Sequence, residues 1–98
     1  MSDLITVYIY SVATDMLTRK NQKIVLDVLS SYKIADKKIN FETIDVYSNF
    51  DALDKMRDIV GDPHAKAPQI TKGGEYCGNY DAFEKAVENK TLKEFLKL

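Results

Sequence analysis

The sequence predicts a single α/β domain whose elements follow the order β-α-β-α-β-β-α-α. Three observations indicate that order. A nearly continuous apolar run over 4–10, rich in β-branched and aromatic residues, is typical of a strand buried on both faces. A long one-sided helical pattern follows it, and a glycine-bearing turn at 72–74 separates two short strands in the second half. With 98 residues, of which 45% are hydrophobic, the chain can bury one core without metals or disulfides.

The first half of the chain has the pattern of a strand-helix-strand unit. After the strand at 4–10, the loop 11–15 supplies candidate helix caps, and apolar residues at helical spacing predict a helix over 16–32. Partial alternation of good β formers predicts a second strand over 39–46. A unit of this length pairs its two strands in parallel through a right-handed crossover.

The second half begins with another helix and then changes character. Asn49 is a cap signal for that helix, and Gly61 is a stop signal because glycine readily adopts the left-handed conformation that ends helices. The short strands at 68–71 and 75–77 are expected to pair antiparallel, which makes the four-stranded sheet mixed.

Two helices are predicted at the end of the chain. Asn79 can cap the first of them, and the capping-box pattern Thr91–Glu94 predicts the start of a last helical turn. The predicted fold is therefore a four-stranded mixed sheet flanked by helices.

Composition and charge exclude several classes of function. The 14 basic and 15 acidic residues give a formal charge of -1 without a run of like charges, which argues against a nucleic-acid partner. No secretory signal or membrane-length segment is present, so we expect a monomeric cytoplasmic protein, small enough for nuclear entry, without a membrane partner. Cys77 cannot close an intrachain disulfide alone, and His64 has no second ligand at metal-binding spacing, so no metal site is predicted.

The order of elements, with Ala67-Pro68 opening the third strand and Gly78-Asn79-Tyr80-Asp81 preceding the third helix, resembles a glutaredoxin and thus the thioredoxin-like fold. Within that group the chain resembles the SH3-binding glutamic-acid-rich-like family. Val7-Tyr8-Ile9, Pro68-Gln69-Ile70 and the run from Gly78 to Glu84 carry this resemblance, which covers nearly the whole chain. The resemblance implies small adaptor-like proteins without a catalytic cysteine pair.

The residues themselves also argue against thiol chemistry. A reactive thiolate is normally stabilised at the N-terminus of the first helix, where this chain has Ala13, Thr14 and Asp15. An unactivated threonine hydroxyl is a poor nucleophile, and Asp15 adds negative charge where a thiolate would have to form. Cys77 belongs to the predicted fourth strand and is interpreted as a small apolar residue packed in the sheet. The sequence therefore predicts a protein that is not an enzyme.

The resemblance further implies a groove with a cis Ala67-Pro68 bond, which leaves the Ala67 backbone able to pair with an extended ligand. The helix start at 78–81 could hold a carboxylate, with helix capping as the alternative, and Lys66 and Arg57 could replace a basic residue that glutaredoxins keep elsewhere. The predicted groove, peptide-binding or vestigial for glutathione, consists of Ser11, Thr14, Asp15, Ala67, Pro68, Gln69, Asn79, Tyr80 and Asp81.

Three functional hypotheses follow. The first is a redox-inactive adaptor that binds an extended peptide of a partner protein in this groove and needs no cofactor. The second is a glutathione-binding protein or glutathione-dependent enzyme, in which Ser11, Thr14 or Tyr10 hydrogen-bonds the glutathione sulfur. The third keeps an SH3 or other signalling partner on a different surface, because 63–69 lacks the PxxP spacing of an SH3 ligand.

Overall fold

The computed structural model describes residues 4–13 and 15–98 and follows the predicted order with one added hairpin. The elements are β1 (Ile5–Ile9), α1 (Met16–Ser31), β2 (Lys33–Ile34), β3 (Lys37–Lys38), β4 (Phe41–Asp45), α2 (Phe50–Val60), β5 (Gln69–Lys72), β6 (Glu75–Asn79), α3 (Tyr80–Glu88) and α4 (Leu92–Phe95). No helix of the described residues is long and apolar enough to cross a membrane.

The added hairpin joins β2 and β3 between α1 and β4. Its turn residues Ala35 and Asp36 have φ values of 51° and 65°, so both adopt the left-handed conformation that two-residue hairpin turns use. Sequence patterns signal such a turn by glycine or asparagine, and neither residue occurs here. The hairpin was therefore missed, and the expected strand 39–46 begins later, at Phe41.

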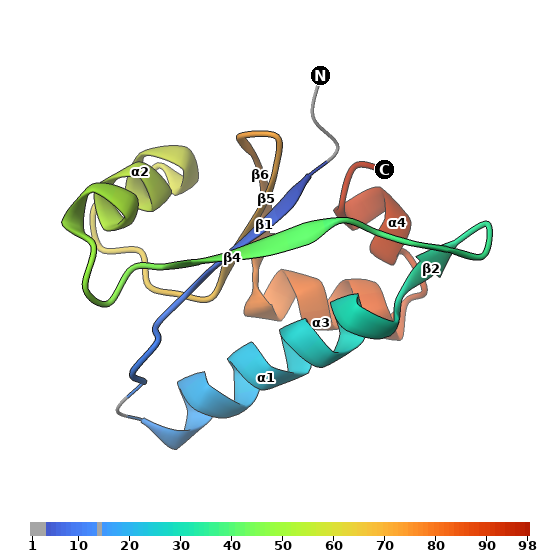
Figure 1. Cartoon of the computed structure of the whole chain (residues 1–98), viewed down its shortest axis with the longest axis horizontal. Coiled ribbons are helices and arrows are strands. Elements are labelled where there is room, and N and C mark those ends of the chain that lie inside the picture. Colours follow the sequence, from blue (N-terminus) through green and yellow to red (C-terminus); the bar gives the residue numbers. More distant parts are fainter. Residues whose placement is uncertain (1–3, 14) are drawn as a thin grey trace.

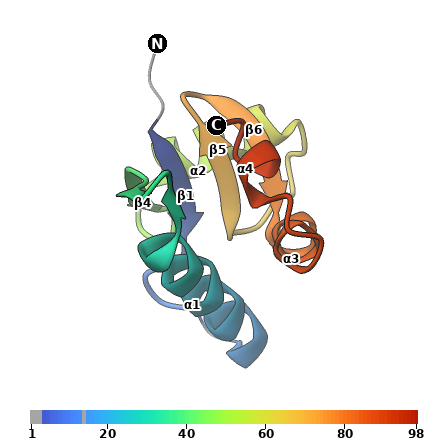
Figure 2. The same ribbon diagram turned by 90° about the vertical axis from the view of Figure 1, so that its right-hand side faces the viewer.

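The four-stranded sheet has the order β4-β1-β5-β6 and is mixed, as predicted. β1 pairs in parallel with β4 and antiparallel with β5, which pairs antiparallel with β6. The first pairing completes the strand-helix-strand unit, and the second pair of strands is the expected glycine hairpin. Figure 1 shows α1 and α3 on one side of the strands and α2 on the other, and Figure 2 shows the same arrangement from its right-hand side.

Each face of the sheet packs against its own helices. Alternation along β1 sends Ile5 and Val7 to the face covered by α1, α3 and α4, where Leu29, Phe83 and Leu96 are buried. Tyr8 belongs to the opposite cluster, whose other buried members are Val46, Met56, Ala65 and Ala67. Because Ala65 and Ala67 pack in this second core, the chain just before β5 is held against the sheet.

The predicted cap signals at Asn49, Gly61 and Asn79 are confirmed, and α4 begins after Thr91 as predicted, although without the side-chain bond of a capping box. The Asn49 side chain accepts a hydrogen bond from the Ala52 N–H at 3.1 Å, and Gly61 ends α2 with a φ of 82°. Asn79 accepts from the Ala82 N–H at 3.0 Å. Thr91 makes no capping hydrogen bond, because its ψ of 26° is not the extended conformation of an N-cap and its own N–H donates to the Ala86 carbonyl.

Candidate functional site

A pocket where β5 begins and β6 ends brings together most of the predicted groove. We call it the Pro68 pocket; its cavity volume is about 340 Å³. The Ala67-Pro68 bond is cis, as the resemblance implied, and Pro68 is buried. The predicted residues that line this pocket are Ala67, Pro68, Gln69, Asn79, Tyr80 and Asp81.

Two side chains hold the backbone that leads into this pocket. Gln69 donates from Nε2 to the Lys66 carbonyl at 2.8 Å and accepts the Tyr76 hydroxyl at Oε1 at 2.7 Å. Arg57 donates from Nε to the Ala65 carbonyl at 3.1 Å. Gln69 and Arg57 therefore act as positioning residues that fix two successive carbonyls, and Arg57 has a structural contact rather than one in the pocket lining.

The backbone of Ala67 has fewer hydrogen bonds than that of Ala65 or Lys66. Its N–H and C=O make no hydrogen bond to another residue of the described chain. Backbone groups in folded proteins are nearly always paired, so an unpaired one beside a groove can accept an added extended segment. The geometry thus agrees with the predicted way of binding.

The start of α3 forms another wall of the Pro68 pocket. Asn79 caps the helix through Ala82, so the capping alternative is observed, while carboxylate binding at the same helix start stays a prediction. Tyr80 donates its hydroxyl to Glu84 at 3.1 Å, within the helix. The exposed carboxyl group of Asp81 also lines the pocket and opposes an anionic ligand there.

Ser11 and Asp15, which the sequence predicts as part of the groove, lie outside the Pro68 pocket. Asp15 lines a neighbouring pocket of about 430 Å³, which we call the Tyr47 pocket. Its lining residues are Tyr10, Val12, Ala13, Asp15, Thr18, Tyr47 and Lys66. Lys66 lines both pockets, so the two adjoin at that side chain. Thr14 lies outside the described residues.

Ser11 is engaged elsewhere. Its N–H and its hydroxyl both donate to the Asp45 carboxylate at 2.9 Å, and the Tyr47 N–H and the Ser48 hydroxyl donate to the same group at 2.9 and 3.0 Å. The backbone N–H groups of Ser11 and Tyr47 contribute most to lowering the pKa of Asp45 to about 2. Ser11 lines a third, smaller pocket with Arg19 and not the Pro68 pocket.

Sequence reasoning missed two residues that shape this loop. The buried Gln22 of α1 accepts the Tyr10 N–H at 2.8 Å and donates to the Tyr10 carbonyl at 3.1 Å. Asp45 closes a turn onto the N–H two residues ahead, as aspartates commonly do. The available signals were a polar residue three positions before Val25 on the apolar stripe of the helix and an aspartate at a strand end.

Exposed apolar side chains gather at the same end of the molecule. Val12 and Tyr47, which line the Tyr47 pocket, are 52% and 55% exposed. The first turn of α1 and the first residue of α2 add Met16, Leu17 and Phe50, also largely exposed. All five follow the carboxyl ends of the parallel strands β1 and β4, so they lie toward the same end of the sheet. Exposed apolar groups of this kind commonly mark protein contact surfaces.

Cys77 lies in β6, half-buried and packed against the larger core cluster. Burial is the main reason why its pKa is raised, so the thiol is protonated at neutral pH. Cys77 lines neither the Pro68 pocket nor the Tyr47 pocket. Its surroundings therefore favour a packing role.

Comparison with solved structures places the fold among glutaredoxin-like proteins, a branch of the thioredoxin class. The Candida albicans actin interacting protein Aip5 superposes with a TM-score of 0.72 at 21% identity, over 94% of this chain and 86% of that one. A buckwheat glutaredoxin solved with glutathione superposes with a TM-score of 0.60 at 18% identity, over 95% and 76% of the two chains.

Sequence comparison also shows the family of the chain. The profile described as SH3-binding, glutamic acid-rich protein matches residues 3–98, and the chain belongs to this family. A Drosophila melanogaster relative named SH3 domain-binding glutamic acid-rich protein homolog is 34% identical over 107 residues, covering 97% of this chain. The chain spans 65% of that relative's length. The resemblance predicted from the sequence is thus confirmed.

Proposed function

We propose that this protein is a redox-inactive adaptor that binds an extended segment of a partner protein in the groove formed by the Pro68 and Tyr47 pockets. The unpaired Ala67 peptide group carries the proposal, because it lies in the Pro68 pocket and can pair with a ligand backbone. A strand added there gains main-chain hydrogen bonds, and the pockets on either side of Lys66 accept its side chains.

The surroundings of the cysteine support the redox-inactive part of the proposal. Ala13 and Asp15 border the start of α1, where a thiol-disulfide enzyme stabilises its thiolate, and neither can form a disulfide. Cys77 has a raised pKa and a position away from the groove, so it does not replace that thiol.

The exposed apolar side chains support a protein partner over a small molecule. Val12 and Tyr47 line the Tyr47 pocket and are still about half exposed, so they offer apolar surface to a ligand. A partner segment that occupies the groove can cover them, which is the usual arrangement of an interface core with a polar rim.

The family's name refers to binding of SH3 domains, which usually bind a proline-rich segment. This chain offers no such segment. Its two prolines are Pro63, which is exposed, and Pro68, which is buried in the pocket wall. They therefore cannot present the exposed, regularly spaced pair that an SH3 groove binds. We infer that any SH3 partner contacts a different surface of this protein.

Glutathione binding is the second candidate function. The structural likeness to a glutaredoxin solved with glutathione favours it, as does the placement of Lys66 near the start of α3 in one pocket. Against it, the Ser11 hydroxyl already donates to Asp45 and so is not available to a sulfur. The Asp81 carboxyl group in the same pocket also repels the carboxylates of glutathione.

A pair of NMR titrations separates the two functions. Reduced glutathione is added to labelled protein up to millimolar concentration, and the amides of Ala67 and Asn79–Asp81 are followed. The adaptor proposal predicts no saturating shift of these amides. Joint, saturable shifts would instead establish the glutathione site and reject the redox-inactive adaptor as the leading function.

The second titration uses peptides selected from a displayed library against the folded protein. We expect selected peptides to shift Lys66, Ala67 and Tyr47 together, and the exposed substitution Lys66→Glu to weaken them. Lys85→Glu makes the same charge change on the far part of α3 and serves as the matched control. The proposal would be contradicted if Lys66→Glu and Lys85→Glu changed peptide affinity equally. It would also be contradicted if the peptides shifted only amides outside the groove.

A further inference from the structure

A separate pocket lies at the other end of the sheet. Ile5 of β1 pairs with both Phe41 of β4 and Lys72 of β5, so this pocket borders the amino end of β1, whereas the groove borders its carboxyl end. We call it the basic pocket; its cavity volume is about 300 Å³. Ile34, Ile39 and Leu98 supply its apolar lining, and five lysines line the rest, among them Lys37, Lys93 and Lys97.

The charged side chains that line this pocket are all lysines. No aspartate or glutamate is among the described residues that line it, although the whole chain has a formal charge of -1. Among the described residues, the ammonium groups of Lys37, Lys93 and Lys97 form no ion pair with an aspartate or glutamate side chain. Lysines gathered from separate segments raise the local positive potential and attract anions.

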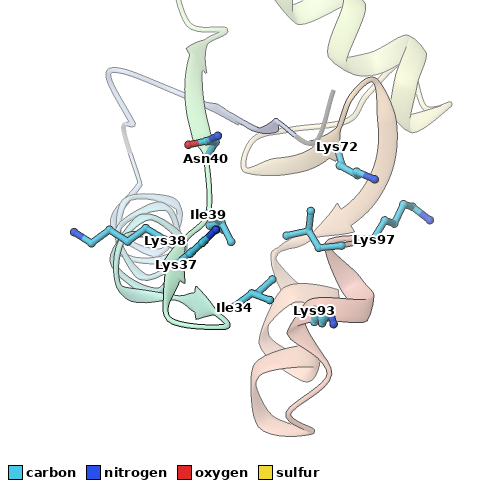
Figure 3. Close-up of a pocket in the computed structure, with 9 residues that line it drawn as sticks. Ile34, Lys37, Lys38, Ile39, Asn40, Lys72, Lys93 and Lys97 are labelled. Atoms are coloured by element: carbon cyan, nitrogen blue, oxygen red, sulfur yellow. The ribbon is translucent and has the colours of Figure 1, made fainter. Parts of the chain in front are cut away.

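The side chains are arranged on two sides of an apolar centre. Figure 3 shows Lys37 on the side of the β2–β3 hairpin, Lys93 and Lys97 on the side of the C-terminal helix, and Ile34 and Ile39 between them. The Lys38 side chain extends away from the other lysines. A ligand that fits must therefore combine negative charge at both ends with an apolar group in the middle.

We propose that the basic pocket binds an acidic peptide segment of a partner protein, with carboxylates beside Lys37 and Lys93 and an apolar side chain on Ile34 and Ile39. Charge complementarity identifies this occupant, and the apolar lining separates it from purely polyanionic ligands. Because the basic pocket and the groove lie at opposite ends of the sheet, binding at one leaves the other accessible.

Two other anionic partners fit the pocket less well. Single-stranded nucleic acid is normally bound by aromatic side chains that stack on bases, and no aromatic residue is among the described residues that line the pocket. An amphipathic helix binds a bilayer surface by inserting a protruding apolar face, whereas here the apolar groups line a concavity.

A fluorescence-polarisation experiment tests the proposal with two labelled peptides, Glu-Glu-Leu-Glu-Glu and its neutral counterpart Gln-Gln-Leu-Gln-Gln. We expect the acidic peptide to bind the unmodified protein at least roughly tenfold more tightly, and its affinity to fall with added salt. The double variant Lys37→Glu/Lys93→Glu should weaken the acidic peptide by roughly tenfold or more.

Controls separate a site from general charge. Lys55→Glu/Lys85→Glu makes the same charge change on α2 and α3, and we expect it to alter acidic-peptide affinity by no more than about twofold. Lys38→Glu should have a smaller effect than Lys37→Glu, because its ammonium group points away. If the double variant does not unfold cooperatively on heating, the single charge-removing variants Lys37→Gln and Lys93→Gln take its place.

Several results would overturn the proposal. These are equal affinity for the two peptides, equal losses in the pocket and control variants, or absence of acidic-peptide binding. The same holds if phosphatidylserine vesicles or single-stranded oligonucleotides bind in a manner that requires Lys37 and Lys93 while the acidic peptide does not. The groove proposal is tested by different amides, so the two can fail independently.

Discussion

The chain at 65–69 and the loop after β1, residues 10–13 with Asp15, form the two walls of the groove, and they differ in burial. In the first wall Ala65, Ala67 and Pro68 are buried, and side-chain hydrogen bonds fix two of its carbonyls. In the second wall, hydrogen bonds hold Tyr10 and Ser11 at one end and the Ala13 carbonyl at the other, whereas Val12 between them is largely exposed. One wall is part of a core and the other has an exposed middle between tethered ends, so we expect ligand-dependent adjustment in the second wall.

The largest expected loss of stability comes from adding a side chain at Gly78, next to Asn79 of the Pro68 pocket. A Cβ added at this position would lie 2.7 Å from Phe95 Cε1 and 3.0 Å from Ala82 Cβ. Gly78→Val should therefore destabilise the protein by about 3 kcal/mol in urea unfolding, because overpacking forces the Phe95 ring and the start of α3 to move.

A double-mutant cycle checks that physical reason. In a Phe95→Ala background the clash is relieved, so the additional cost of Gly78→Val should shrink substantially. An undiminished cost in that background would place the strain in the backbone and not at the Phe95 ring.

The next largest loss of stability is expected from removing the Gln22 side chain, which holds the Tyr10 backbone of the second wall. Gln22→Ala leaves the N–H and C=O of Tyr10 without their partners, and we expect a loss of about 2 kcal/mol in the free energy of unfolding. Amide shifts should be confined to 10–13. The neighbouring exposed change Lys20→Ala is the control and should stay within about 0.5 kcal/mol. Shifts of equal size at 65–69 would show that the two walls are coupled.

A smaller effect is expected from the corresponding hydrogen bond of the first wall. Tyr76→Phe removes the donor to Gln69 Oε1 and should cost about 1 kcal/mol. The amide shifts should reach Lys66 and Ala67 and leave Ser11 unchanged. Tyr32→Phe serves as the control, because the Tyr32 hydroxyl makes no hydrogen bond to another described residue. Equal costs for the two variants would contradict the role assigned to Gln69.

The smallest effect appears only in acid. Folding lowers the pKa of Asp45 to about 2 from an ordinary value of 3.8, so its stabilising contribution is complete above about pH 5. It is lost as the pH falls through 3.8 and then through the folded pKa, because the carboxyl group is protonated in both states only below that value. A carboxyl carbon titration of Asp45 by NMR should have its midpoint near 2.

Comparing unfolding temperatures tests the same assignment. Between pH 4 and pH 2 the Asp45→Asn variant should lose less thermal stability than the unmodified protein, because it has no charge at this site to neutralise. Asp54→Asn makes the same charge change at an exposed position of α2 and is the matched control. A midpoint of the Asp45 titration near its ordinary value would contradict the set of hydrogen bonds described here.

Local patterns predicted most of the fold because its elements follow local rules. The apolar run of β1, the caps at Asn49 and Asn79, and the glycine hairpin between β5 and β6 are all confirmed. The β2–β3 hairpin escaped prediction because Ala35 and Asp36 adopt positive φ without a glycine. The last helical turn begins after Thr91 as predicted, but the capping box does not form, because the end of α3 already engages the Thr91 N–H.

The candidate site was predicted less completely. The family resemblance located Ala67, Pro68 and Asn79 in one pocket, but sequence alone could not show that Ser11 bonds to Asp45 and lies elsewhere. That contact joins positions 34 apart in the chain, so no local spacing reports it. The binding role of the groove stays a prediction that the titrations above test.

The sequence by itself determined the α/β class, the order of the main elements and the absence of a cysteine before α1, because propensity, periodicity and residue identity are local properties. Only the tertiary structure decided how the groove is divided and where lysines 37, 93 and 97 gather around an apolar centre. Both depend on which distant segments the sheet brings together, and the free energy of that pairing comes from burial of the whole core.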